Sequence, residues 1–278
     1  MDGQWFRRFG DPAPDALRLI CFPHAGGAAS AYRPLSRLLR PHVEVRAVQY
    51  PGRQDRRLET PVADIGELAA TVARKLEDEA EAEARAGRTG DAGAPFAFFG
   101  HSMGALVAYE TARILEERGA RPPRRLFLSA RGAPGSRRSP HDVPADDDAI
   151  LAAVRRLGGT GVALLDDPEL VAMVLPALRA DYAALAAYSW TPGEPLRTPV
   201  TVLCGDADPV VSVEEAAGWR AFTHAETEVR VFPGGHFYVD QRLDDVAGVV
   251  LRGVRPASAA RVGNDACHDS SRAFDVRG

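Results

Sequence analysis

The sequence lacks the features of a zinc, disulfide or membrane protein. Its three cysteines, Cys21, Cys204 and Cys267, form no CxxC pair and cannot all be joined in disulfides, so we expect free thiols and no structural zinc. No run of about 18 apolar residues is present, and the N-terminus has no apolar core of signal-peptide length. These absences predict a cytoplasmic protein that does not interact with membranes.

Excess positive charge is also missing. The formal net charge is −4 over 278 residues, which argues against a nucleic-acid surface. Hydrophobic residues make up 45% and charged residues 26%, a globular composition that is long enough for one well-packed α/β domain. We expect a monomer that needs neither a metal nor an organic cofactor.

Short apolar segments alternate with segments of helical periodicity along most of the chain. Strands are expected at 16–22, 42–50, 96–100, 124–130, 199–205 and 227–234, and helices at 64–86, 105–118, 214–222 and 243–251. The alternation predicts an α/β fold over residues 1–254, with a mostly parallel central sheet and helices on both faces. Residues 255–278 are rich in Ala, Ser, Arg and Asp without any period, and we expect this tail to be disordered.

Residues 131–198 interrupt the alternation, because no strand is evident there. Residues 167–190 are strongly helical, with an apolar stripe formed by Val171, Val174, Leu175, Leu178, Tyr182 and Leu185. An insertion of this length predicts a helical lid over about residues 135–195. The alternative is a set of extra packing helices, so the stripe either lines an acyl pocket or packs on the sheet.

A serine lies between two glycines where an apolar strand gives way to a helix, in Gly100-His101-Ser102-Met103-Gly104. This GxSxG pattern is typical of a sharp strand-to-helix turn that exposes a nucleophilic serine at the carboxyl edge of a sheet. The N-terminus of the following helix favours a negatively charged oxygen nearby. Ser102 is therefore the candidate nucleophile.

A serine hydroxyl needs a base, and the base needs a carboxylate to orient it. His236 follows a predicted strand, and both Asp206 and Asp208 follow the strand before it. The order Ser, acid, His along the chain is the one found in α/β folds that carry a nucleophilic serine at such a turn. Asp208 is the preferred acid because it lies further beyond its strand and can reach the histidine. Asp206 lies nearer the strand end and is interpreted as a turn former.

The glycine-rich loop after the first strand, "CFPHAGGAASAY", has two interpretations. A nucleotide cradle is disfavoured because the loop lacks GxGxxG and the Walker lysine. We interpret it instead as an oxyanion loop, in which the backbone N–H groups of Ala25 and Met103 would stabilise a tetrahedral intermediate. His24 would then order the loop, and His101 would be a packing residue.

Together these segments resemble the type II thioesterases, the stand-alone editing enzymes of modular polyketide and nonribosomal peptide pathways. The matching stretches run from Trp5 to Asp240 and include "LICFPHAGGAASAYRPLS", "VQYPGRQDRR", "FFGHSMGALVAYETARILEERG", "LPALRADYAALAAY", "VLCGDADPVVSVEEAAGWR" and "VFPGGHFYVD". The resemblance implies an α/β-hydrolase fold with a helical lid and a triad of Ser102, Asp208 and His236. It also implies hydrolysis of aberrant or stalled acyl thioesters on the phosphopantetheine arm of an acyl or peptidyl carrier protein.

An acidic carrier protein would need a local basic patch on this slightly acidic enzyme. Six arginines follow two of the predicted strands, and they are either a docking surface or merely solvated: Arg53, Arg56, Arg57, Arg131, Arg137 and Arg138.

Three other functions would carry different features. A general serine carboxylesterase of the same fold would prefer oxygen esters to pantetheine thioesters. A chain-terminating cyclase would be expected beside a carrier domain, and the chain has none. A non-catalytic binding scaffold would usually have lost one of the three candidate catalytic residues.

Overall fold

The computed structural model describes residues 5–10, 13, 16–87, 95–136, 139–159, 162, 165–254 and 272–273. They form a central sheet of eight strands in the order β1-β3-β2-β4-β5-β6-β7-β8, parallel except for the two edge strands. The strands are β1 Phe6–Arg8, β2 Leu17–Phe22, β3 Val43–Val48, β4 Phe96–His101, β5 Leu126–Ser129, β6 Val200–Gly205, β7 Thr227–Phe232 and β8 Arg272–Ala273. The predicted α/β fold with a mostly parallel sheet is therefore confirmed.

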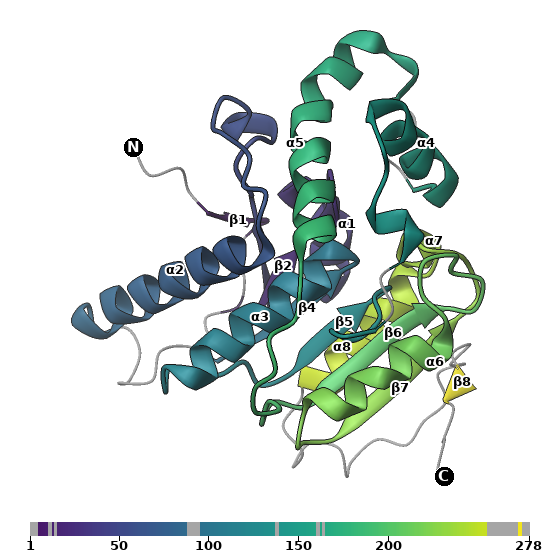
Figure 1. The fold of residues 1–278 in the computed structure, drawn as a ribbon. Helices are drawn as coiled ribbons and strands as arrows, with labels where there is room; N and C mark the ends of the chain where they lie inside the picture. The colour runs from purple at the N-terminus through teal and green to yellow at the C-terminus, as the bar shows by residue number, and fades with distance from the viewer. Residues whose placement is uncertain are drawn as a thin grey trace.

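Helices cover both faces of the sheet (Figure 1). The helices are α1 Arg33–Leu39, α2 Ile65–Arg85, α3 Met103–Glu117, α4 Asp147–Leu157, α5 Pro168–Ala187, α6 Val213–Ala217, α7 Tyr238–Gln241 and α8 Leu243–Val254. The helices α2 and α3 contribute to one hydrophobic core, and α1 and α8 contribute to the core on the opposite face. The inner strands are buried along nearly their whole length because both faces of the sheet are covered.

Two short edge strands lie outside the strands predicted from the sequence. The strand β1 pairs antiparallel with β3, and β8 pairs antiparallel with β7. Arg272 and Ala273, which form β8, lie within the tail that we expect to be disordered; residues 255–271 and 274–278 lie outside the described part of the chain. Two residues are too few to leave a periodic signal in the sequence.

The insertion between β5 and β6 contains α4 and α5, which stand together above the sheet (Figure 1). The N-cap of α5 is Asp167, and Pro176 lies inside the helix. By length and composition alone, α5 is the one helix among the described residues that could span a membrane. It carries the fully buried Asp181, and its C-terminal half packs into the hydrophobic core. These are properties of a helix that packs against a globular domain. We refer to α4 and α5 as the lid helices.

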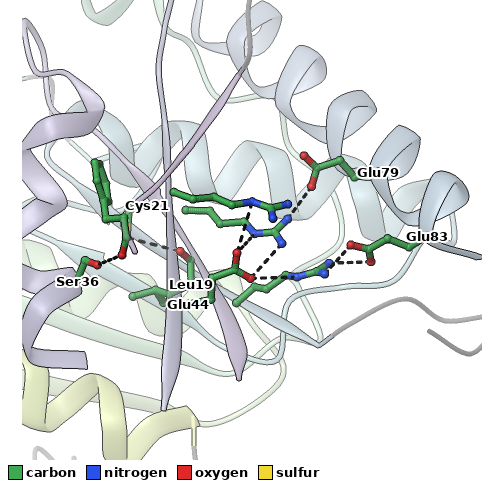
Figure 2. A network of polar contacts seen from close by, with 10 residues as sticks. Leu19, Cys21, Ser36, Glu44, Glu79 and Glu83 are labelled. Atoms are coloured by element: carbon green, nitrogen blue, oxygen red, sulfur yellow. Dashed lines mark hydrogen bonds and ion pairs between the residues drawn. The ribbon is translucent and has the colours of Figure 1, made fainter. Parts of the chain in front are cut away.

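A cluster of buried charges fastens α2 to the amino ends of β2 and β3. Glu44 contacts Arg46 at 2.9 Å and Arg18 at 3.5 Å, while Arg46 donates to Glu79 at 2.8 Å and Arg18 donates to Glu83. Figure 2 shows Glu44, Glu79 and Glu83 converging in this network. The strand ends that carry this cluster are opposite to those that carry the site described next.

Candidate active site

Ser102 occupies the turn between β4 and α3 in a strained backbone conformation. Its φ of 54° and ψ of −119° are unusual for a residue with a side chain, and its N–H donates to the Ser129 carbonyl at 2.8 Å. A Cβ atom on Gly104 would lie 2.0 Å from the Phe22 carbonyl oxygen, and one on Gly100 would lie 2.3 Å from the Gly104 carbonyl oxygen. Only glycine fits at either position, which explains the GxSxG spacing.

The structure brings Ser102, His236 and Asp208 into one hydrogen-bonded chain. Ser102 Oγ lies 2.9 Å from His236 Nε2, and His236 Nδ1 lies 2.9 Å from Asp208 Oδ2. The His236 and Asp208 side chains are buried. With a proton on Nδ1 donated to Asp208, Nε2 is free to accept the Ser102 hydroxyl proton.

The two candidate acids have different partners. Asp208 Oδ1 accepts the Val210 N–H at 2.8 Å besides its contact with His236. Asp206 is exposed, and its Oδ1 accepts the Gly234 N–H at 2.9 Å. Asp206 therefore holds the loop that leads to His236 and does not contact the imidazole.

The glycine-rich loop lies beside Ser102. Ala25 and Gly26 line the same cavity as Ser102 and His236, and Met103 begins α3, where backbone N–H groups lack intrahelical acceptors. Within the described part of the chain, neither the Ala25 nor the Met103 N–H has a hydrogen-bond partner. Both groups are thus open to an oxyanion at Ser102.

Two further histidines, His24 and His101, lie beside this site but are not part of the hydrogen-bonded chain of Ser102, His236 and Asp208. His101 is buried, and its Nδ1 lies 2.9 Å from Ser129 Oγ, which lies 2.6 Å from the Tyr238 hydroxyl. Burial lowers the pKa of His101 well below its ordinary value. Burial, with the nearby His236 and Arg53, lowers the pKa of His24 to about 4. Both rings are therefore neutral at pH 7.

A cavity of about 130 Å³ extends from Ser102 under the lid. Its apolar lining comes from both lid helices and includes Val154, Leu157, Val174, Leu178, Tyr182 and Leu185. Leu178, Tyr182 and Leu185 also belong to the hydrophobic core. The apolar stripe of α5 therefore serves both alternatives raised above, because it packs on the sheet and lines a cavity.

Three of the arginines considered for partner docking are unsuited to that role. Arg53 is buried and pairs with Asp181, and Arg56 is buried and donates to Glu59 at 2.8 Å. Arg131 donates to Asp142 through two bonds of 2.8 Å. Their guanidinium groups are committed inside the protein, which the sequence pattern did not reveal. Arg57 is exposed, and 137–138, the other two arginines of this set, lie outside the described residues.

Within the part of the chain that the structure describes, the two cysteine thiols are not rival nucleophiles. Burial raises the pKa of the Cys204 thiol to about 12 and raises that of Cys21 well above its ordinary value, so neither is a ready nucleophile. No group of three metal-ligating side chains occurs among the described residues.

The open parallel sheet, the strained serine turn and the Ser-His-Asp chain at the carboxyl edge define an α/β hydrolase. The thioesterase domain family model matches residues 17–252. The thioesterase PikA5 of Streptomyces venezuelae is 44% identical over 94% of this chain and 90% of its own length. On this match the chain belongs to the thioesterase family, and it is a hydrolase that acts on thioesters.

Solved structures agree with this assignment. The type II thioesterase BorB of the borrelidin biosynthetic cluster superposes with a TM-score of 0.78 and 41% identity, over 90% of this chain and 98% of that one. YbtT, a type II thioesterase of the yersiniabactin pathway, gives a TM-score of 0.76 and 31% identity, over 90% and 98%. The family resemblance stated from the sequence is confirmed.

Sequence reasoning missed Asp181, Ser129 and Tyr238. Asp181 lies in the apolar stripe of its helix. The one sequence feature that could have indicated a role is a single carboxylate at a position that the helical periodicity predicts to be buried. Ser129 and Tyr238 contact His101 from distant parts of the chain, so no local pattern could connect them.

Proposed function

We propose that this enzyme is a stand-alone type II thioesterase that hydrolyses aberrant or stalled acyl thioesters from the phosphopantetheine arm of acyl or peptidyl carrier proteins. The observation that carries the proposal is the chain of hydrogen bonds from Ser102 Oγ through His236 to Asp208, buried beneath a lid and beside an apolar cavity. Two similar structures support the proposal: YbtT is a type II thioesterase of a mixed nonribosomal peptide and polyketide pathway, and BorB is a type II thioesterase of the borrelidin biosynthetic cluster.

The chemistry assigns a role to each residue. His236 Nε2 takes the proton of Ser102 as its Oγ attacks the thioester carbonyl, and the N–H groups of Ala25 and Met103 stabilise the developing oxyanion. The tetrahedral intermediate collapses, the pantetheine thiol leaves with the proton from His236, and the acyl group stays on Ser102. His236 then activates water, which releases the acid. Asp208 keeps the Nδ1 tautomer and stabilises the imidazolium.

Two hollows fit the two parts of such a substrate. The cavity under the lid would hold a short acyl chain. A groove of about 610 Å³ shares His24, Gly26 and Val174 with that cavity and passes between α5 and the loop after β3, where Arg57 lies. An extended pantetheine arm would suit this groove, with its phosphate near Arg57.

Docking of the carrier protein then depends on fewer arginines than the sequence suggested. Arg57 is the described member of the set that is free for such a contact, and Arg137 and Arg138 stay candidates. We propose that one chain acts alone, since Ser102, His236 and Asp208 come from the same chain. A cytoplasmic location fits an enzyme that serves biosynthetic carrier proteins.

Intact mass spectrometry of a carrier protein loaded with acetyl or propionyl on its phosphopantetheine tests this function. We expect the wild-type enzyme to remove the acyl mass and the Ser102→Ala variant to leave it. If the folded enzyme cleaves a small oxygen ester yet removes none of several acyl groups, the carboxylesterase alternative replaces this proposal.

Charge reversal at Arg57 tests the docking role. It should raise the KM for the acyl carrier protein and leave the KM for acyl-pantetheine unchanged; equal losses on both substrates would exclude a docking role.

A further inference from the structure

A buried carboxylate in the lid holds the loop that carries Ala25. Asp181 of α5 has no exposed side-chain surface. Its Oδ2 accepts the Gly26 N–H at 2.7 Å, and both its oxygens pair with Arg53. The lid helix thus makes a charge-assisted hydrogen bond to the peptide that directly follows the Ala25 residue.

Arg53 extends this connection along the same loop. Its Nε donates to the Gly27 carbonyl at 3.3 Å and its Nη1 donates to the Pro51 carbonyl at 2.6 Å. Its guanidinium also lies 5.1 Å from the centre of the Tyr50 ring. Asp181 and Arg53 therefore bind two successive residues of the loop, one through the Gly26 N–H and the other through the Gly27 carbonyl.

The same turn of α5 also touches the loop through an apolar side chain. Gly26 has a φ of +75°, and a Cβ atom on it would lie 2.4 Å from Leu178 Cδ2. Leu178 and Asp181 are three positions apart, so they lie on one face of the helix. Packing by Leu178 and hydrogen bonding by Asp181 together fix the orientation of the Gly26 peptide.

We propose that Asp181 is a positioning residue for the oxyanion hole, which acts through the Gly26 N–H to hold the Ala25 N–H toward Ser102. This inference rests on the proposed acyl transfer at Ser102. An oxyanion donor must lie about 2.7–3.1 Å from the developing charge, and a displacement of about 1 Å is costly in rate. The loop is irregular between β2 and the turn at 29–32, so its geometry depends on contacts from other elements.

A purely structural ion pair would behave differently from a positioning residue. Buried pairs can often be replaced by apolar side chains of similar volume without loss of stability, provided that both charges are removed. Such a replacement cannot accept the Gly26 N–H. Stability and catalysis can therefore be separated by two double variants that share Arg53→Met and differ only in whether position 181 keeps an acceptor.

The experiment compares Asp181→Asn/Arg53→Met, which keeps a side-chain oxygen, with Asp181→Leu/Arg53→Met, which does not. The readouts are the melting temperature, the second-order rate constant for labelling of Ser102 by a fluorophosphonate, and kcat and KM for acetyl-pantetheine. We expect the leucine variant to label about tenfold more slowly than the asparagine variant. Its loss should appear in kcat rather than KM, with both proteins folded.

Equal labelling rates and equal kcat in the two folded double variants would overturn the inference. If either double variant does not fold, the single variant Asp181→Asn, which loses the charge but keeps an oxygen, is compared with Asp181→Ser at a temperature where both are folded. The serine side chain is too short to reach Gly26, so we expect Asp181→Ser to be labelled at less than about one-third of the rate of Asp181→Asn. Equal labelling rates would again overturn the inference. Asp147→Asn is the matched control, because it breaks the exposed pair between Asp147 and Arg179 in the same lid, and it should change none of the readouts.

The two proposals fail in distinguishable ways. A wild-type enzyme that is labelled at Ser102 but hydrolyses no thioester contradicts the proposed function, while the labelling comparison still tests Asp181. A wild-type enzyme that hydrolyses thioesters, with no difference between the matched double variants, contradicts only the role of Asp181.

Discussion

His236 Nδ1 lies 3.0 and 2.9 Å from the two carboxylate oxygens of Asp208, and neither side chain has appreciable exposed surface. The contact is buried, so the carboxylate acts on the imidazole without competition from water. It orients the ring toward Ser102 and fixes which nitrogen carries the proton. Asp206, two residues earlier, instead serves the loop backbone at Gly234.

The two aspartates therefore predict opposite outcomes on substitution. Asp208→Asn should lower kcat for acyl-pantetheine hydrolysis by roughly 10⁴-fold, because an amide in that place favours the wrong imidazole tautomer. Asp206→Asn keeps an oxygen for the Gly234 N–H and should change kcat less than about fivefold. Steady-state kinetics of the two purified variants decides the assignment, and a larger loss for Asp206→Asn would reverse it.

Stability should fall with acidity because His101 is buried as a neutral ring. Its pKa in the folded protein lies well below the ordinary value of 6.5, so between these two values the unfolded chain binds a proton that the folded protein does not. The free energy of unfolding is then fully retained above pH 6.5 and decreases as the pH falls, by up to about 1.4 kcal/mol per pH unit for this one group.

Urea unfolding at pH 7.5, 6.5, 5.5 and 5.0 measures this dependence. His101→Gln cannot take up the proton, so its free energy of unfolding should fall less steeply below pH 6.5 than that of the wild type. His42→Gln is the matched control, since His42 is exposed, and its slope should equal the wild-type slope. Parallel slopes for all three proteins would contradict the burial argument for His101.

The charge cluster at the amino ends of β2 and β3 should affect stability and leave catalysis intact. Glu44 is buried and contacts Arg18 and Arg46, of which Arg46 is 2% exposed. Glu44→Gln removes the carboxylate between these two cations; because Arg18 and Arg46 keep Glu83 and Glu79 as partners, we expect the loss of a charged hydrogen-bond acceptor to cost about 1.5–3 kcal/mol. Chemical denaturation should show this loss, while kcat at 25 °C stays within about twofold of wild type. A large loss of kcat in the folded variant would show that the cluster reaches the active site.

Local sequence patterns predicted those parts of the site that depend on backbone geometry. Gly100 and Gly104 reveal the serine turn because no other residue fits there, and Asp208 and His236 follow strands whose carboxyl ends must share one edge. The patterns could not predict which polar groups are buried against one another. Arg53 and Asp181 are 128 positions apart, and Arg53 therefore looked like a surface cation until the fold placed it beside the lid.

The cavity under the lid should set the length of acyl chain that the enzyme accepts. Leu157, at the end of α4, lines this cavity, whereas Leu151 of the same helix packs against the core and does not. Leu157→Ala should enlarge the space beyond Ser102 and raise the ratio of kcat/KM for hexanoyl-pantetheine to that for propionyl-pantetheine by at least about tenfold, since even one further methylene group accommodated in an apolar pocket contributes about 1–3 kcal/mol. Leu151→Ala should lower stability and leave this ratio unchanged.

Competition between the two thioesters in one reaction, followed by mass spectrometry, measures the ratio directly. An unchanged ratio for Leu157→Ala would place the acyl chain elsewhere, with the groove beside Arg57 as the next site to test.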